Sequence, residues 1–485
     1  MTPIRCLAVT SEIYPIIKTG GLADVAGAMP IALKAHDVDT RSLVPGYPDV
    51  IKTLASASVV LRLPDFFGGS VRILAGTCGD LEVLAVDAPH LFYRHGNPYT
   101  APDGRDWPDN GMRFAALSLI AARIGQGAIP SFVPDIIHAH DWQAGLTPAY
   151  LHYTNQPRPG TVLTIHNMAY QGQFAAEMLS AFNLPPESFS IHGVEYYGAI
   201  GFLKAGVQFA DRITTVSSTY AKEIQSDEGG MGLAGLLRER SGVLSGIING
   251  IDTTVWSPET DPHIACGYNA TNLTFRTVNK PALQRRFNLD PDPDAMLLGV
   301  ISRLSWQKGL DLLLECIPTI LDQGIQLALL GTGDANLQER FLAAAHAHPG
   351  RISAVIGYDE GLAHLIQAGS DALVVPSRFE PCGLTQLCAL RYGSIPIVAR
   401  VGGLEDTVVD IDDAGDDEGV GTGVKFAPGF SDHLAAALRR TNQAFQDKSQ
   451  WRRLQLNGMS TNVSWDRRAG EYAALYRDIL AARQQ

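Results

Sequence analysis

Residues 371–407 place a carboxylate within a stretch of backbone that can bind an anion. The apolar run Ala372–Val375 is typical of a buried parallel strand, and the spacing from Gly383 onward predicts a helix that ends at Gly393. A helix that begins just after such a strand presents free N–H groups at the carboxyl edge of the sheet, where nucleotide phosphates bind. Glu380 lies in this loop. It can act on a bound molecule, or it can form an ordinary charge–dipole pair at a helix start.

A second loop, residues 302–309, carries two cations. It follows a predicted strand over residues 296–301 and precedes a predicted helix, so Arg303 and Lys308 are expected at the same kind of edge. Two cations beside N–H groups suit a diphosphate leaving group, because negative charge develops on it as its bond breaks. The alternative, two solvated loop bases, is less favoured because the flanking pattern places both at the sheet edge.

The first strand of the chain is followed by another glycine-rich loop. Lys18 stands just before the pair Gly20-Gly21, and a helix is predicted over residues 22–35. A cation beside free N–H groups can hold a phosphate. The lysine precedes the glycines, so this is not a Walker loop, and a solvated loop lysine is the competing interpretation.

Two further predicted strands end in histidines. Residues 135–139 lead into His140-Asp141-Trp142, and residues 161–165 lead into His166-Asn167. Each histidine alone would most often be a core residue bonded to backbone. Because parallel strands end at a common edge, the two pairs together predict a site.

Aromatic residues indicate which ligands these edges could bind. The polar loop 93–111 contains Tyr93, Tyr99 and Trp107, and exposed aromatics in such loops suit sugar rings. Tyr358 follows a predicted strand and can stack on a base. The glycines at 331 and 333 lack the third glycine of a dinucleotide fingerprint, so NAD binding is not expected.

Composition excludes several classes of protein. The chain has 485 residues, 46% hydrophobic and 18% charged, which predicts a globular protein of two or more domains. With 50 acids against 38 bases and no basic cluster, neither nucleic acid nor a membrane surface is an expected partner. No signal peptide or run of about 20 apolar residues is found, which predicts a cytoplasmic protein. The six cysteines lack metal-ligand spacing, so no metal site is predicted.

Alternating strands and helices on both sides of one turn predict the organisation. The count of strand–helix pairs restarts after the Asn249-Gly250 turn. We therefore expect an α/β protein with two doubly wound domains, residues 1–250 and 251–464. Residues 465–485 are predicted as an amphipathic helix that packs back on the first domain.

Six motifs resemble, in order, those of the bacterial glycogen synthases and plant starch synthases. They are KTGGLADV (18–25), HAHDWQAG (138–145), TIHNMAYQG (164–172), INGID (248–252), SRLSWQKG (302–309) and PSRFEPCGLTQL (376–387). The resemblance implies the GT-B fold, two Rossmann-like domains facing each other across a deep cleft. It also implies metal-free transfer of glucose from ADP-glucose to the non-reducing end of an α-1,4-glucan such as glycogen, with retention and with no cofactor. Whether the chain forms a homo-oligomer is left open.

The resemblance also implies roles for individual residues. The implied catalytic residues are Glu380, His166, Arg303 and Lys308. The implied donor-binding residues are Lys18, Gly21, Asn249, Arg303, Lys308, Tyr358, Cys382, Gly383, Leu384 and Thr385, with Lys18 and Gly21 reaching the phosphates from the opposite domain. Glu12, Asp141 and Asn167 match positions on the acceptor side. Cys388 stands where broader GT-B enzymes carry a second glutamate, so their ribose contact is not carried over.

Two other functions compete with this one. A glucan phosphorylase of the same fold would need a lysine that holds pyridoxal phosphate and a much longer chain. A catalytically silent glucan-binding protein would be expected to have lost Lys18, Arg303, Lys308 or Glu380, and all four are present. Whether Glu380 or the donor phosphate carries the main catalytic role is not decided by the sequence.

Overall fold

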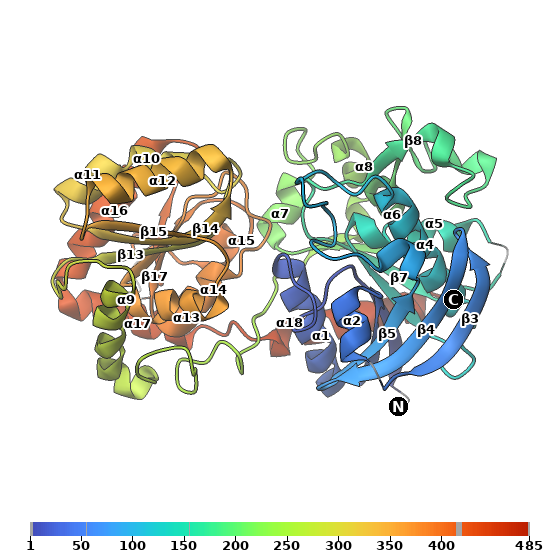
Figure 1. The fold of residues 1–485 in the computed structure, drawn as a ribbon, viewed down its shortest axis with the longest axis horizontal. Helices are drawn as coiled ribbons and strands as arrows, with labels where there is room; N and C mark the ends of the chain where they lie inside the picture. The colour runs from blue at the N-terminus through green and yellow to red at the C-terminus, as the bar shows by residue number, and fades with distance from the viewer. Residues whose placement is uncertain (1–2, 55, 155, 414–419, 484–485) are drawn as a thin grey trace. The chain divides into compact units, whose positions relative to one another are not determined.

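The computed structural model describes residues 3–54, 56–154, 156–413 and 420–483. These residues form two compact units (Figure 1). The first unit comprises the described part of Met1–Asn249 and Trp465–Gln485, and the second comprises that of Gly250–Ser464. Each unit is built on a sheet of mainly parallel strands, so the predicted α/β class is confirmed.

The first unit contains a nine-stranded sheet among its described residues. In spatial order its strands are β12 (Leu244–Gly246), β11 (Arg212–Thr215), β7 (Gly160–Ile165), β6 (Ile136–His140), β1 (Ile4–Val9), β2 (Val38–Pro45), β5 (Leu81–Asp87), β4 (Gly69–Cys78) and β3 (Ser58–Phe66). The first seven are parallel, whereas β4 is antiparallel to both neighbours. The strand order reverses between β1 and β6, which in such sheets marks the place where ligands bind.

Helices and a small antiparallel sheet complete the first unit. The helices are α1 (Gly21–Leu33), α2 (Pro48–Thr53), α3 (Pro89–Phe92), α4 (Asn110–Gly125), α5 (Leu146–His152), α6 (Phe202–Phe209), α7 (Ser218–Glu223), α8 (Ala234–Glu239) and α18 (Trp465–Arg483). The small sheet consists of β8 (Gln173–Ala175), β10 (Ala199–Gly201) and β9 (Glu195–Tyr196).

The last helix of the chain, α18, belongs to the first unit. Its residues Trp465, Tyr472 and Tyr476 are buried in one apolar cluster with Val25 and Met29 of α1. The Tyr476 hydroxyl also lies 2.7 Å from Nδ1 of His138 in β6. The predicted return of the terminal helix to the first half is therefore confirmed.

The second unit is a parallel six-stranded sheet among its described residues, in the order β15 (Ile352–Ile356), β14 (Gln326–Gly333), β13 (Leu297–Leu304), β16 (Ala372–Val375), β17 (Ile395–Ala399) and β18 (Val424–Phe426). Numbered along the chain, this order is 3-2-1-4-5-6, that of the Rossmann fold. The order reverses between β13 and β16. We call the carboxyl ends of these two strands the switch point of the second unit.

The helices of the second unit lie between and after these strands. They are α9 (Asn279–Arg286), α10 (Leu310–Glu315), α11 (Ile317–Asp322), α12 (Ala335–Ala347), α13 (Glu360–Gly369), α14 (Thr385–Tyr392), α15 (Gly402–Thr407), α16 (Ser431–Gln446) and α17 (Lys448–Ser460).

Two predicted boundaries were wrong. β13 continues to Leu304 instead of ending at residue 301, because β14 pairs with it along its whole length, including Arg303 with Thr332. Arg303 therefore lies in a strand and not in a loop. The helix expected from Gly383 begins two residues later, at Thr385.

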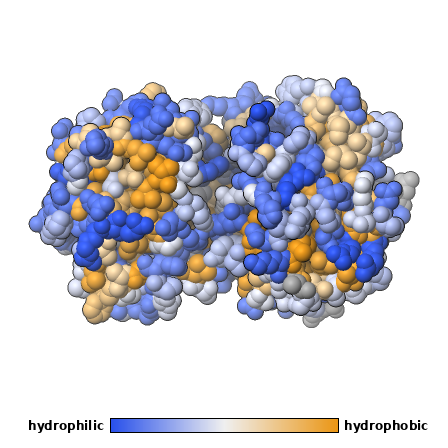
Figure 2. All heavy atoms as spheres, viewed as in Figure 1, coloured by the Kyte–Doolittle hydropathy of each residue, from blue (hydrophilic) through white to orange (hydrophobic). Residues whose placement is uncertain are grey.

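Hydrophilic and hydrophobic side chains are interspersed over the visible face of each unit (Figure 2). Among the described residues, no helix has the length and apolar character needed to cross a membrane.

We predict that the hydroxyl of Tyr476 stabilises the docking of α18. Tyr476→Phe should lower the free energy of unfolding by about 1–2 kcal/mol, because it leaves a buried histidine nitrogen without its partner. Tyr476→Ala should cost about 3–5 kcal/mol through the additional loss of packing. Urea denaturation would measure both values. Tyr197→Phe, at a side chain that is 81% exposed, is the control and should change little; equal losses in the two Phe variants would contradict the prediction.

Candidate active site

A buried ion pair joins the two loops at the switch point of the second unit. Lys308 follows β13 and Glu380 follows β16, and Lys308 Nζ lies 2.5 Å from Glu380 Oε2. The Glu380 side chain is 8% exposed, and the Ser377 hydroxyl donates to the same carboxylate oxygen at 2.8 Å. The structure thus brings together two residues that the sequence placed 72 positions apart. A molecule bound here would contact an ammonium and a carboxylate that are already in contact with each other.

Arg378, which the sequence analysis did not single out, braces these loops. Its backbone N–H donates to the Gln307 carbonyl at 2.9 Å, and its guanidinium donates to the Trp306 carbonyl at 2.7 Å. The same guanidinium forms a bidentate pair with Asp311. These hydrogen bonds hold the pKa of Asp311 below its usual range. Arg378 therefore fixes the loop that carries Lys308 against the loop that carries Glu380.

Gln386 orients the backbone of the anion-binding loop, which we define as residues 382–385. This buried side chain donates to the carbonyls of Cys382 and Gly383, both at 2.9 Å. In a trans peptide the N–H points opposite to the C=O, so the N–H groups of Gly383 and Leu384 point away from Gln386. Gly383 has φ +73° and sits so close to Gln386 that a Cβ would collide with it. The predicted anion-binding backbone therefore depends on a glutamine that sequence periodicity marked only as a helix position.

The start of α15 packs directly against the backbone of Glu380. The Gly403 N–H donates to the Glu380 carbonyl at 3.1 Å. Gly402 has φ +41°, and a Cβ there would lie 2.0 Å from the same carbonyl oxygen. Only glycine permits this approach, which explains the paired glycines of the sequence.

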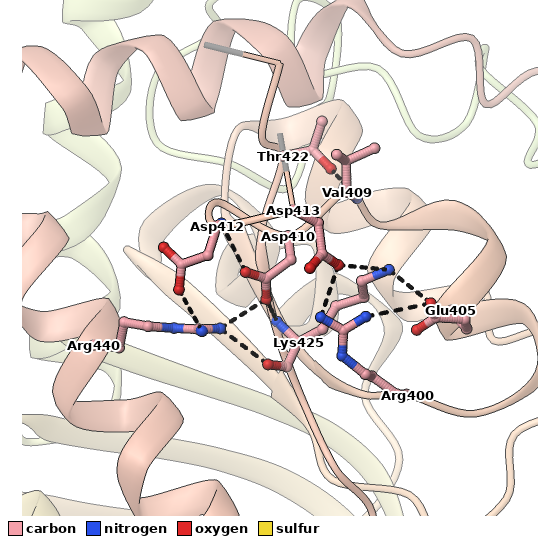
Figure 3. A network of polar contacts seen from close by, with 9 residues as sticks. All are labelled: Arg400, Glu405, Val409, Asp410, Asp412, Asp413, Thr422, Lys425 and Arg440. Atoms are coloured by element: carbon pink, nitrogen blue, oxygen red, sulfur yellow. Dashed lines mark hydrogen bonds and ion pairs between the residues drawn. The ribbon is translucent and has the colours of Figure 1, made fainter. Parts of the chain in front are cut away.

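An ion network holds α15 in place (Figure 3). Glu405 of α15 pairs with Lys425 at 3.0 Å and with Arg400 at 3.4 Å. Asp413 pairs with Arg400 at 2.7 Å. Figure 3 shows that Asp410, Asp412 and Arg440 extend the network. Because Lys425 is nearly buried, these contacts restrain the helix whose first residues support Glu380.

The other donor-binding candidates of the second unit lie farther along its loops and strand ends. Arg303 is an exposed residue near the end of β13. Tyr358 is 71% exposed, follows β15 as predicted, and donates its hydroxyl to Glu360. Cys382 is buried, and Thr385 is the first residue of α14. Their contacts with a donor stay predictions.

In the first unit, Glu12 occupies backbone groups that the sequence analysis treated as free. Its carboxylate accepts the N–H of Thr19, the Thr19 hydroxyl at 2.6 Å and the N–H of Gly20 at 3.2 Å. The Tyr99 hydroxyl donates to the same carboxylate. The expectation of free N–H groups at this turn was wrong for these two, because a nearby carboxylate satisfies them.

The remaining features of this turn are Lys18 and Gly21. Lys18 Nζ lies 2.9 Å from Asp24 Oδ1 and 5.2 Å from the centre of the Tyr14 ring. Gly21 is the first residue of α1. Lys18 is thus partly neutralised, and a phosphate at this place would have to share it with Asp24.

The strand ends of β6 and β7 meet as predicted. Their ladder is parallel, and His140 Nδ1 lies 3.0 Å from His166 Nε2. The His166 backbone N–H donates to Asp141 Oδ1 at 2.7 Å. Burial lowers the pKa of His140 to about 3 and that of His166 well below its usual value, so both imidazoles are neutral at pH 7. A neutral His166 can exchange hydrogen bonds with a sugar hydroxyl without bringing charge.

The last two predicted site residues of the first unit are asparagines. The Asn167 side chain accepts the N–H of Ala169, so it shapes its own turn. Asn249 is 6% exposed, and its Oδ1 has no hydrogen-bond partner among the described residues. Such a buried oxygen can accept a hydrogen bond from a bound molecule.

Comparison with known proteins identifies the family. Residues 5–239 match the family described as starch synthase catalytic domain, and residues 283–452 match glycosyl transferases group 1. The chain is 67% identical to glycogen synthase 2 of Bradyrhizobium diazoefficiens and 61% identical to a glycogen synthase of Rhodopseudomonas palustris. Each alignment covers at least 99% of both chains. The chain belongs to the glycogen synthase family.

Solved structures agree with this placement in the glycogen synthase family. The catalytic domain of starch synthase IV from Arabidopsis thaliana, bound to ADP and acarbose, matches with a TM-score of 0.89 at 31% identity, covering 99% of this chain and all of that one. Sucrose-phosphate synthase from Thermosynechococcus elongatus matches with a TM-score of 0.60 at 17% identity, which shows the fold alone. The resemblance to glycogen and starch synthases and the predicted GT-B fold are confirmed. The family favours a synthase over the phosphorylase and the silent binding protein.

The buried Asp141 should make the stability of this glycogen synthase family member depend on pH. Burial raises the pKa of Asp141 to about 7 from an ordinary value near 3.8. The folded state therefore binds a proton that the unfolded state has released, so the contribution is fully present below about pH 4 and is lost as pH rises to about 7. Asp141→Asn cannot ionise, and its side-chain oxygen can still accept the N–H of His166.

The expected result is a stability difference between Asp141→Asn and wild type that grows with pH. It should favour the variant by up to about 4 kcal/mol above pH 7 and vanish near pH 4. Urea denaturation at several pH values would measure it. The exposed Asp478→Asn is the control. A difference that does not change with pH would show that Asp141 is not buried as an acid.

Proposed function

We propose that this chain is a retaining glucosyltransferase that moves glucose from ADP-glucose to the non-reducing end of an α-1,4-glucan and releases ADP. The observation that carries this proposal is the Lys308–Glu380 pair at the switch point, beside the anion-binding loop. Full-length identity to glycogen synthases supports glycogen as the acceptor. The ADP in the Arabidopsis starch synthase supports an adenine nucleotide as the leaving group.

In the second unit, the diphosphate would lie against the N–H groups of Gly383 and Leu384. Lys308 would exchange part of its contact with Glu380 for the diphosphate, and Arg303 would add a second positive charge. Both cations would stabilise the negative charge that develops on the diphosphate as the glycosidic bond breaks. Tyr358, exposed after β15, would stack on adenine.

Glu380 is better suited to electrostatic stabilisation than to nucleophilic attack. It already accepts from the Lys308 ammonium and the Ser377 hydroxyl, and such pairing makes a carboxylate a weaker nucleophile. Retention would then follow from attack on the same face as departure, with the leaving diphosphate taking the proton of the acceptor 4-hydroxyl. In this route the carboxylate stabilises positive charge at the sugar.

The first unit would bind the sugar groups. Neutral His166 would hydrogen-bond the donor glucose, and Asn249 offers a buried acceptor oxygen. Glu12, Tyr99 and Asp141 would shape the acceptor side. The first two are joined by a hydrogen bond from the Tyr99 hydroxyl to the Glu12 carboxylate, in the loop after β1. Lys18 and Gly21 reaching the same phosphates stays a prediction.

The proposed function is tested by ADP release. Purified chain incubated with ADP-glucose should release ADP only when glycogen is added, and the new glucose should be removed by an enzyme specific for α-1,4 linkages. ADP release that does not depend on glycogen, or no release at all, would contradict the proposal. UDP-glucose in a parallel reaction measures how strictly adenine is required.

Lys308→Ala should lower kcat by about 10²–10³-fold, as does the loss of one donor to a developing negative charge. The structure adds a cost in stability that an exposed lysine would not have, because Glu380 would stay buried without its cation. Activity should therefore be measured per folded molecule, by initial rates together with circular dichroism. Lys222→Ala, an exposed lysine of α7, is the control. Normal turnover of folded Lys308→Ala would overturn the role proposed for this lysine.

We also expect turnover to persist in EDTA. Arg303 and Lys308 would supply the positive charge that neutralises the leaving diphosphate, so no divalent cation is needed for that step. Initial rates in EDTA should equal those in buffer. Complete loss of activity, restored by Mg²⁺ or Mn²⁺, would contradict the expectation.

A further inference from the structure

Two histidines of β6 differ in how their ring nitrogens are satisfied. His138 forms hydrogen bonds at both nitrogens, with the Tyr476 hydroxyl at 2.7 Å and with the Thr164 hydroxyl at 2.5 Å. His140 forms only one, because its Nδ1 lies 3.0 Å from Nε2 of His166. Its Nε2 is buried and has no hydrogen-bond partner among the described residues. His140 is therefore a buried imidazole with one satisfied nitrogen and one unsatisfied nitrogen.

The ring of His140 is held where it lies. It stacks on the His138 ring, with 4.3 Å between the ring centroids and 27° between the planes. On the side of β7, the His166 ring lies with its centroid 5.2 Å away and is tilted by 39°. His140 has no exposed surface, so solvent does not reach its Nε2. The position of its proton is therefore decided by the contact with His166.

One proton lies between the rings of His140 and His166. Burial lowers the pKa of His140 to about 3 and that of His166 well below its usual value, so both rings are neutral at pH 7. A neutral imidazole carries an N–H on one nitrogen and a bare acceptor on the other. The hydrogen bond therefore has two forms. Either His140 Nδ1–H donates to His166 Nε2, or His166 Nε2–H donates to His140 Nδ1.

The two forms leave different groups unpaired. If His166 donates, the proton of His140 lies on its Nε2, which is then a buried N–H without an acceptor. If His140 donates, that Nε2 is a bare nitrogen, and the proton of His166 lies on its Nδ1. A buried N–H without an acceptor is rarer in folded proteins than a buried acceptor without a donor. The form in which His140 donates is therefore favoured.

We propose that His140 is a positioning residue that holds His166 in the tautomer with its proton on Nδ1. His166 is only partly buried, and its Nδ1 forms no hydrogen bond among the described residues. This nitrogen is also not closed off from solvent, so it can contact a bound molecule. His166 thus presents a fixed N–H donor, and the group that faces it must accept. That this group belongs to the donor glucose rests on the proposed function; the tautomer does not.

The tautomer is measured by ¹⁵N NMR of the full chain, deuterated and carrying ¹⁵N-labelled histidine, at pH 7 without ligand. The nitrogen chemical shift distinguishes a protonated ring nitrogen from a bare one. The signals of His166 are identified by their loss in His166→Leu. The expected result is a protonated Nδ1 and a bare Nε2 for His166, with the same arrangement in His140. A proton on Nε2 of His166 would overturn the proposal.

His140→Leu tests whether His140 is the cause. Leucine is apolar, and the unsatisfied Nε2 of His140 has no hydrogen bond to lose, so the variant should fold, which circular dichroism checks. His166 Nε2 then lacks its donor, and part of the His166 population should carry the proton there. A His166 that stays wholly protonated on Nδ1 would overturn the role of His140. His152→Leu, at an exposed histidine of α5, is the control and should leave the His166 signals unchanged.

Kinetics distinguish positioning from a structural role. If the chain transfers glucose as proposed, His140→Leu should lower kcat/KM about twofold to tenfold, because only the fraction of His166 in the correct tautomer can donate. Adding His140→Leu to His166→Leu should cause no further loss, since one residue acts through the other. Losses that multiply would overturn the proposal. Absence of transfer in wild type would contradict the proposed function alone, and the ¹⁵N spectra would still decide the tautomer.

Discussion

The ion pair between Lys308 and Glu380 is the interaction on which the proposed donor site of the second unit depends. Taking two charges out of water costs several kcal/mol per ion in real proteins, so such a pair persists only where the geometry is fixed and further hydrogen bonds are made. Arg378 holds the loop that carries Lys308 through its hydrogen bond to the Trp306 carbonyl. The Ser377 hydroxyl donates to the Glu380 carboxylate, and the Gly403 N–H donates to the Glu380 carbonyl. The ion network around Lys425 in turn restrains the helix that begins with that glycine.

The two units place polar residues at the same position in their sheets, but the types of residue differ. In both sheets the strand order reverses beside the first strand, and polar residues gather at that point. The second unit gathers charges and the backbone N–H groups of Gly383 and Leu384, which suit a diphosphate. The first unit gathers neutral histidines, a phenol and carboxylates that are already hydrogen-bonded, which suit hydroxyl groups. This division agrees with a donor nucleotide in the second unit and sugar groups in the first.

Sequence periodicity predicted what depends on local apolar patterns. The strands β1 and β16, the cap at Gly393 and the return of α18 were all predicted, because each follows from a short run of residues or an amphipathic face. The meeting of His140 with His166 followed from strand parallelism. The end of β13 was not predicted, because it is determined by pairing with β14, which continues to Leu304. The roles of Gln386, Arg378 and Glu12 were missed because each depends on contacts with residues in other loops, which periodicity does not contain.

The central claim is that the diphosphate of the donor is held at the switch point of the second unit. A crystal structure of the full chain with ADP tests this most directly. The account predicts that a diphosphate oxygen lies within hydrogen-bond distance of Lys308 Nζ and of the N–H groups of Gly383 and Leu384, with Lys308 shared between phosphate and Glu380. ADP bound with its diphosphate elsewhere, and with the Lys308–Glu380 pair untouched, would contradict it.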